Sequence, residues 1–130
     1  MGTTLGFSKT TSLTYEQAIA KTTEELKKEG FGVLTEIDVK ETMKKKLNAE
    51  FRPYKILGAC NPTLAHQALQ QEIELGMFLP CNVIVYQGDD GRTIVSAVDP
   101  NVALGRLNRP ALQPIADQVA ERLRRVIAAV

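Results

Sequence analysis

Strand-like and helix-like segments alternate along the chain, and this alternation limits the possible folds more than any other sequence feature. The spacing of apolar residues predicts strands over residues 4–10, 31–37, 54–59, 81–87 and 92–98, with helices between and after them. The first helix has clear ends, because Thr14 and Gln17 form a capping box and Gly30 stands at the usual terminating position. Segments in this order predict a sheet packed against helices rather than an all-helical or all-β fold.

The order of the elements favours an α+β fold in two layers, with one mixed sheet of about five strands and helices on one face. Helices that separate successive strands are typical of parallel neighbours. The last two strands are joined by residues 88–91 and must form an antiparallel hairpin. A length of 130 residues fits a single domain, residues 1–130.

Charge and composition disfavour several classes of partner. Sixteen Lys and Arg residues face fifteen Asp and Glu residues, so the net charge is +1 and no overall excess favours nucleic acid or an anionic membrane. No apolar run approaches the roughly 18 residues of a membrane-spanning helix. The N-terminus lacks a secretory signal, and two cysteines are too few for a disulfide scaffold. We therefore expect a cytoplasmic protein with reduced thiols and no membrane partner.

Three blocks in the middle of the chain carry a family resemblance. Residues 51–62 read FRPYKILGACNP, residues 76–83 read GMFLPCNV, and Asp99-Pro100 follows the last predicted strand. Together these blocks resemble the domain of unknown function 302 family. The resemblance implies a single α+β domain with a fold related to the TATA-binding-protein-like sheets, and it implies a homodimer. It implies no established activity, and a likeness of fold to a DNA-binding protein is not evidence of DNA binding.

Cys60 is the strongest candidate for chemistry. It follows a predicted buried strand and precedes a helix that Asn61 caps and Pro62 begins, so the helix dipole favours its thiolate. A thiolate there would be a nucleophile or a soft metal ligand. The structural alternative is a small apolar side chain that fills the corner between strand and helix, since free cysteine is often buried. We expect Cys60 to be mostly buried and unreactive at pH 7.

Cys81 and Asn82 form a second Cys-Asn pair at the start of a predicted strand. A parallel crossover would place Cys60 and Cys81 at opposite ends of the sheet, and a disulfide needs Cα atoms about 4.4–6.8 Å apart, so we expect no bridge. Asparagine is disfavoured in strands, so Asn82 either fastens the preceding loop or touches a ligand. Cys60, Asn61, Cys81 and Asn82 are therefore the candidate ligand-binding residues, with no catalytic residue, metal site or cofactor predicted.

A basic run lies on the predicted short second helix. Lys44, Lys45 and Lys46 are expected to face solvent, while Val39, Met43 and Leu47 form a stripe that we expect to be buried. The leading functional hypothesis is a homodimeric module that is non-enzymatic or binds an unidentified small molecule. Two alternatives stay open: a thiol-dependent enzyme or soft-metal-binding protein centred on Cys60, and anion or nucleic-acid binding through residues 44–46.

Overall fold

In the part of the chain that the structure describes, five strands form one open sheet in the order β1-β5-β4-β3-β2, and every neighbouring pair is antiparallel. The computed structural model describes residues 5–105 and 107–130. Its strands are β1 (Gly6–Thr11), β2 (Gly32–Asp38), β3 (Tyr54–Cys60), β4 (Cys81–Gln87) and β5 (Thr93–Val98). Its helical elements are α1 (Tyr15–Lys28), α2 (Val39–Leu47), α3 (Pro62–Gln71), η1 (Ile73–Phe78), α4 (Pro100–Leu104), η2 (Pro110–Leu112) and α5 (Gln113–Ala129). The α+β class and the hairpin of β4 and β5 are confirmed.

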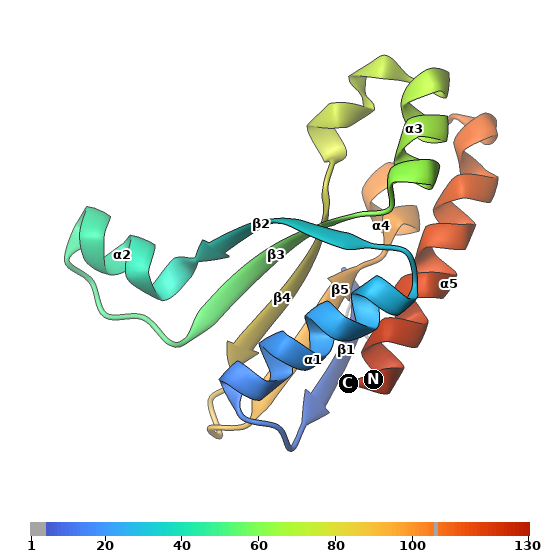
Figure 1. Cartoon of the computed structure of the whole chain (residues 1–130). Helices are drawn as coiled ribbons and strands as arrows, with labels where there is room; N and C mark the ends of the chain where they lie inside the picture. Colours follow the sequence, from blue (N-terminus) through green and yellow to red (C-terminus); the bar gives the residue numbers. More distant parts are fainter. Residues whose placement is uncertain (1–4, 106) are drawn as a thin grey trace.

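The expectation of parallel neighbours in a mixed sheet is wrong, and the positions of the connecting helices explain why. α2 lies beyond one end of the sheet, and α3 with η1 lies beyond the other end (Figure 1). The chain therefore re-enters the sheet at the end where it left, so these connections act as long hairpins. The connection through α1 is different, because it joins the two edge strands β1 and β2 and therefore passes across one face of the sheet (Figure 1).

Two helices, α1 and α5, cover one face of the sheet and form the core with it (Figure 1). The capping box predicted for α1 is present: Thr14 Oγ1 accepts from the Gln17 backbone N–H at 3.1 Å, and Gln17 Oε1 accepts from the Thr14 N–H at 3.0 Å. Gly30 has a φ of +85°, the left-handed conformation expected after a helix end. Fully buried aliphatic side chains fill the space between the layers: Leu26, Leu57, Val83, Val85, Val95 and Leu123.

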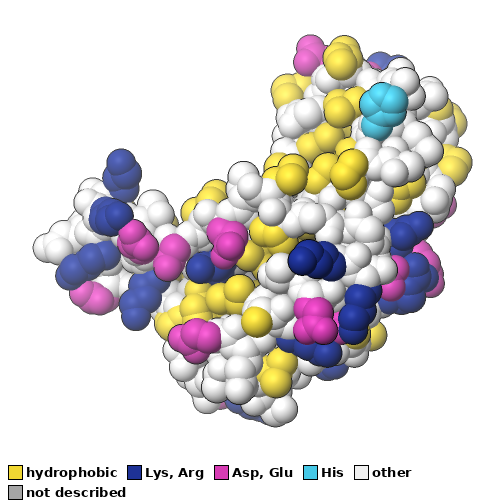
Figure 2. Space-filling view, viewed as in Figure 1, with side chains coloured by type: hydrophobic (Ala, Val, Ile, Leu, Met, Phe, Trp, Pro, Cys, Tyr) yellow, Lys and Arg dark blue, Asp and Glu magenta, His cyan; other side chains and the backbone are white. Residues whose placement is uncertain are grey.

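The second helix contradicts the predicted burial of its apolar stripe. α2 contains no buried residue, and the Leu47 side chain is 70% exposed. The helix projects from the sheet as an arm, with both basic and acidic side chains on its surface (Figure 2). The predicted exposure of Lys44, Lys45 and Lys46 is confirmed. The apolar stripe has helical spacing, as expected, but no element within residues 5–105 and 107–130 buries it.

None of the helices in the described part of the chain combines the length and the hydropathy needed to cross a membrane.

Candidate ligand pocket

The end of β3 and the start of β4 lie side by side. Ala59 pairs with Cys81 in the antiparallel register, and Cys60 and Asn61 follow Ala59 directly. The expectation that Cys60 and Cys81 lie at opposite ends of the sheet is therefore wrong. It assumed that β3 and β4 are parallel, whereas they are antiparallel. Both cysteines are nevertheless free thiols. Ala59 and Cys81 lie directly opposite each other, so their side chains share one face of the sheet. Cys60 is one position further along its strand, so its side chain starts from the other face.

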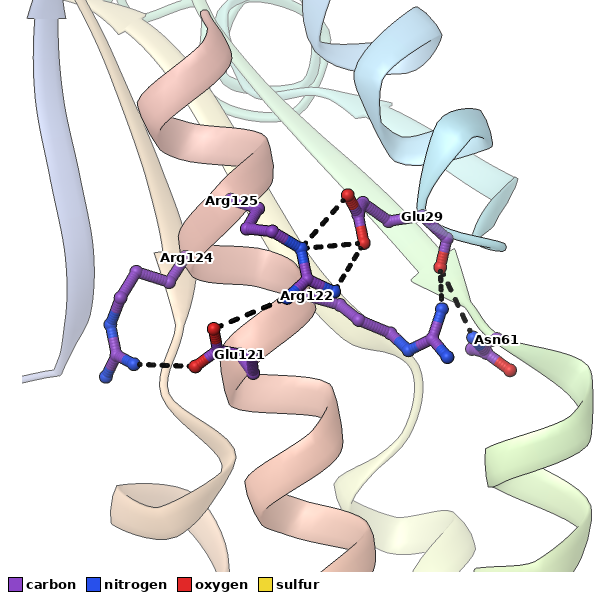
Figure 3. A network of polar contacts seen from close by, with 6 residues as sticks. All are labelled: Glu29, Asn61, Glu121, Arg122, Arg124 and Arg125. Atoms are coloured by element: carbon purple, nitrogen blue, oxygen red, sulfur yellow. Dashed lines mark hydrogen bonds and ion pairs between the residues drawn. The ribbon is translucent and has the colours of Figure 1, made fainter.

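Asn61 has a structural task that uses its whole side chain. Its Oδ1 accepts from the Leu64 backbone N–H at 3.2 Å and caps α3, as predicted, and its Nδ2 donates to the Glu29 carbonyl at 3.5 Å. Arg122 Nη1 donates to the same carbonyl at 3.0 Å (Figure 3). The cap thus ties the start of α3 to the end of α1 and to α5. Because both polar atoms of the Asn61 side chain have a partner within the protein, no ligand is needed to explain why this residue is buried.

A pocket of about 150 Å³ opens at this end of the sheet, and Cys60, Asn61, Cys81 and Asn82 all line it. The remaining walls come from α3, η1, α4 and α5 and are mostly apolar. Four small side chains, Ala65, Ala68, Ala103 and Ala116, face the space and leave it open. Among the residues that the structure describes, none that lines the pocket carries a charged side chain. The pocket therefore suits an uncharged and mostly apolar guest.

Burial governs the chemistry of both thiols. Burial, together with a smaller effect of the neighbouring Cys60, raises the pKa of the Cys81 thiol to about 11. It also raises the pKa of the Cys60 thiol above its usual value, although Cys60 is only half-buried rather than mostly buried as expected. The dipole of α3 acts in the opposite direction but contributes only about 0.3–1 kcal/mol in ordinary settings. Both thiols are consequently protonated near neutral pH.

Asn82 lies at an exposed position opposite Gly58 in the register of β3 and β4. A Cβ atom on Gly58 would stand 2.4 Å from Thr35 Oγ1 and 2.8 Å from Pro80 Cγ. Glycine is therefore required there, because Thr35 and the Pro80 that precedes β4 both pack onto its backbone. This close packing fixes the Leu79-Pro80 segment against β3, and the segment forms part of the pocket wall.

The basic run and the histidine lie away from this pocket. Lys45 pairs with Glu41 at 2.6 Å and Lys44 with Glu50 at 2.8 Å, so part of the positive charge of α2 is neutralised locally. His66 is exposed on α3. Within residues 5–105 and 107–130, no three His, Cys, Asp or Glu side chains are grouped closely enough to hold a metal ion.

Two features of the site were not predicted from sequence. One is the opposite face of the sheet, where the described residues place no helix layer and partly exposed apolar side chains stand in rows. The other is η1, a separate turn after α3 that forms one wall of the pocket. The sequence does contain a sign of the uncovered face, because β3 and β4 carry apolar residues at positions that point to both faces of the sheet.

The fold and the pocket define a class of protein: a single open-sheet α+β module with an apolar pocket where β3 ends and β4 begins. The family model described as "Domain of unknown function DUF302" matches residues 7–130, and the chain belongs to this family. It is similar to the crystal structure of an uncharacterized conserved DUF302 protein from Bacillus stearothermophilus. The two are 34% identical with a TM-score of 0.90, over 96% of this chain and 97% of that chain. A comparison with curated proteins gave no match.

Proposed function

We propose that the protein is a homodimeric, non-enzymatic module that binds a small apolar molecule in the pocket at the β3–β4 end. The observation that carries this proposal is the pocket itself. An apolar cavity of about 150 Å³ in another protein stays dry and accepts benzene or xenon, which sets the scale of the guest. The pocket described here has the same volume, and its wall is built from apolar side chains around two thiols.

Titration of ¹⁵N-labelled protein with benzene tests the binding function. We expect shifts of the backbone amide signals that are confined to residues around the pocket, such as Ala68, Leu75 and Ala116. Ala116→Leu places a larger side chain in the cavity and should abolish these shifts. Because Ala116 is buried and the variant could fold poorly, the more exposed wall residue Ala103 offers a milder variant, Ala103→Leu. Shifts spread over the whole surface, or unchanged in both variants, would contradict the proposal.

The homodimer is supported by the uncovered face of the sheet. Ile37, Ile56 and Ile84 lie in one line across β2, β3 and β4. The Tyr54 and Tyr86 rings stack beside this line with their centroids 5.3 Å apart. A sheet normally buries an apolar face against another layer. A second copy of the chain supplies such a layer through a two-fold, self-complementary contact.

The proposed interface includes α2, because the uncovered face alone is small. At ordinary strand spacing the face measures about 20 Å by 20 Å. Each partner in a stable dimer buries about 800 Å² of surface, so the face alone is too small. The apolar stripe of α2, in which Met43 is half-buried and Leu47 is exposed, would add the missing area. A short helix with an unburied apolar stripe is also marginal by itself in water and gains stability from a partner.

Sedimentation velocity at several protein concentrations tests the dimer. Ile84→Lys places a charge in the centre of the uncovered face and should convert the dimer into a folded monomer. The matched control is Val102→Lys, because Val102 is an exposed aliphatic residue on α4. A wild-type chain that sediments as a monomer at 100 μM, or a dimer that both variants leave intact, would contradict this part of the proposal.

The two alternative functions make different demands on the site. Thiol chemistry centred on Cys60 needs a thiolate near neutral pH, whereas burial raises the pKa of this thiol. Anion binding through Lys44, Lys45 and Lys46 needs unpaired charge, whereas two of these lysines are paired with Glu50 and Glu41. The geometry therefore favours the apolar pocket.

A further inference from the structure

The turn η1 presents apolar side chains to solvent at one wall of the pocket. The exposed fractions are 80% for Ile73, 75% for Met77 and 46% for Phe78, while Leu75 between them is buried. Leu75 and Phe78 line the pocket. Figure 2 shows hydrophobic side chains gathered on the surface at this end of the molecule. Single exposed apolar residues are ordinary, but three of them on one six-residue turn form a patch that indicates a binding surface.

We infer that the natural guest of the pocket is an unbranched alkyl chain, with about six carbons inside and the following carbons lying along η1. This inference rests on the proposed binding function of the pocket. A cavity of this volume holds a molecule of about the size of benzene. A guest of only that size would fill the cavity and leave Ile73 and Met77 in water. A longer chain covers the wall and the patch together, because Phe78 belongs to both.

The polarity of the wall decides which end of the chain enters. The thiols of Cys60 and Cys81 are protonated near neutral pH, and both polar atoms of the Asn61 amide are already engaged. No described residue of the wall carries an opposite charge, and the Asn82 amide that also lines the pocket is neutral, so a charged group inside would lose its hydration without a charged partner, which is strongly unfavourable. The hydrocarbon end therefore enters, and the polar end of the molecule stays in solvent beyond η1.

Calorimetric titration with a series of straight-chain alcohols, from butanol to decanol, tests the inference, with benzene as a compact reference. We expect affinity to rise up to about fourfold for each added methylene that enters the cavity. Beyond hexanol the rise should continue at about twofold for each methylene, because a chain on an exposed patch is only half covered.

Variants of the patch separate its contribution from that of the cavity. The double variant Ile73→Ser and Met77→Ser should remove the rise beyond hexanol and leave the affinities for butanol and benzene unchanged. Leu34→Ser is the matched control, because Leu34 is also an exposed aliphatic residue but lies on β2 and not in the pocket wall. If the control variant also loses the rise in affinity beyond hexanol, the assignment of this rise to η1 is wrong.

The outcomes distinguish this inference from the function on which it rests. If benzene binds but affinity levels off at hexanol, the alkyl-chain inference is wrong and the pocket function stands. If neither benzene nor any alcohol binds, both fail. Flotation with phosphatidylcholine vesicles separates a free chain from an acyl chain in a bilayer. We expect no flotation, and a protein that floats but ignores free alcohols would overturn the inference.

Discussion

Cys81 lies directly opposite Ala59, one residue away from Cys60, in the antiparallel pairing of β3 and β4. This pairing brings two segments that are about twenty residues apart in sequence to the same wall of the pocket. The α3–η1 connection between them supplies further walls, so the pocket is built by one long excursion of the chain beyond the sheet. The reactivity of the two thiols therefore depends on how deeply the pocket buries them.

Both thiols should react slowly with a disulfide reagent such as DTNB at pH 7, because burial raises their pKa values and the reactive form is the thiolate. The reaction of Cys60 should accelerate as the pH passes 9, whereas Cys81, with a pKa of about 11, should lag behind it. Cys60→Ser should leave only the slower phase, and both thiols should react rapidly in urea. Rapid labelling of Cys60 in the folded protein at pH 7 would instead favour thiol chemistry.

Local features of the sequence predicted local structure well. The ends of α1 and the cap of α3 depend on hydrogen bonds between residues three apart, such as Asn61 and Leu64, and these patterns are visible in the sequence. The β4–β5 hairpin was found for the same reason, because its turn is short. In each of these cases the partners are neighbours in the chain.

Strand direction and burial could not be predicted in the same way, because they depend on distant parts of the chain. Whether the chain after α3 returns to the near or the far end of the sheet is decided by packing of α3, η1 and α5 around the pocket. The stripe of Val39, Met43 and Leu47 has the correct helical spacing, but spacing alone does not reveal whether a layer exists to cover it. The four candidate residues line one pocket, and their role in binding a ligand stays a prediction, whereas the reasoning that separated Cys60 from Cys81 was wrong.

Replacing Leu123 with Ala should destabilise the fold by about 2–5 kcal/mol, because a fully buried side chain leaves a cavity between α5 and the sheet. Urea unfolding followed by circular dichroism measures this free energy. Leu47→Ala is the matched control, since Leu47 is exposed on α2 and should change the free energy of unfolding of the monomer by less than about 0.5 kcal/mol. A loss of less than about 0.5 kcal/mol for Leu123→Ala would show that α5 is peripheral.

Replacing Thr22 with Val should stabilise the protein by about 1 kcal/mol. Thr22 lies on α1 and is fully buried, and its hydroxyl is, within the described residues, the one buried side-chain polar atom without a hydrogen-bond partner. Valine keeps the shape and removes the group whose desolvation is uncompensated. Thr23→Val is the comparison, because the Thr23 hydroxyl donates to the Ile19 carbonyl at 2.9 Å. Thr22→Val should raise the melting temperature and Thr23→Val should not.

The ion pair between Arg125 and Glu29 should make stability depend on pH in acid. Arg125 donates to both carboxylate oxygens of Glu29, with the shortest N–O distance at 2.8 Å (Figure 3). This hydrogen bonding lowers the pKa of Glu29 below its usual value of 4.5, despite the opposing effect of burial. The unfolded chain therefore binds the proton at a higher pH than the folded chain does. The stabilisation is fully present above about pH 4.5 and is lost as the pH falls through the lower, folded-state pKa.

Urea unfolding at pH 7, 5, 4 and 3 tests this linkage with two neighbouring variants. Arg125→Gln should be less stable than the wild type at pH 7, and the difference should shrink between pH 5 and pH 3 as Glu29, and Glu121 with which Arg125 also pairs at 3.3 Å, become protonated. Arg124→Gln is the control, because Arg124 pairs with Glu121 at 3.4 Å and stacks over Phe7 but does not contact Glu29. Acidic groups that neither arginine contacts, such as the Glu25 paired with Lys28 and Lys21, affect all three proteins equally and cancel in the differences. A difference for Arg125→Gln that stays constant down to pH 3 would show that Arg125 stabilises the fold by packing on α5 and not through the Glu29 carboxylate.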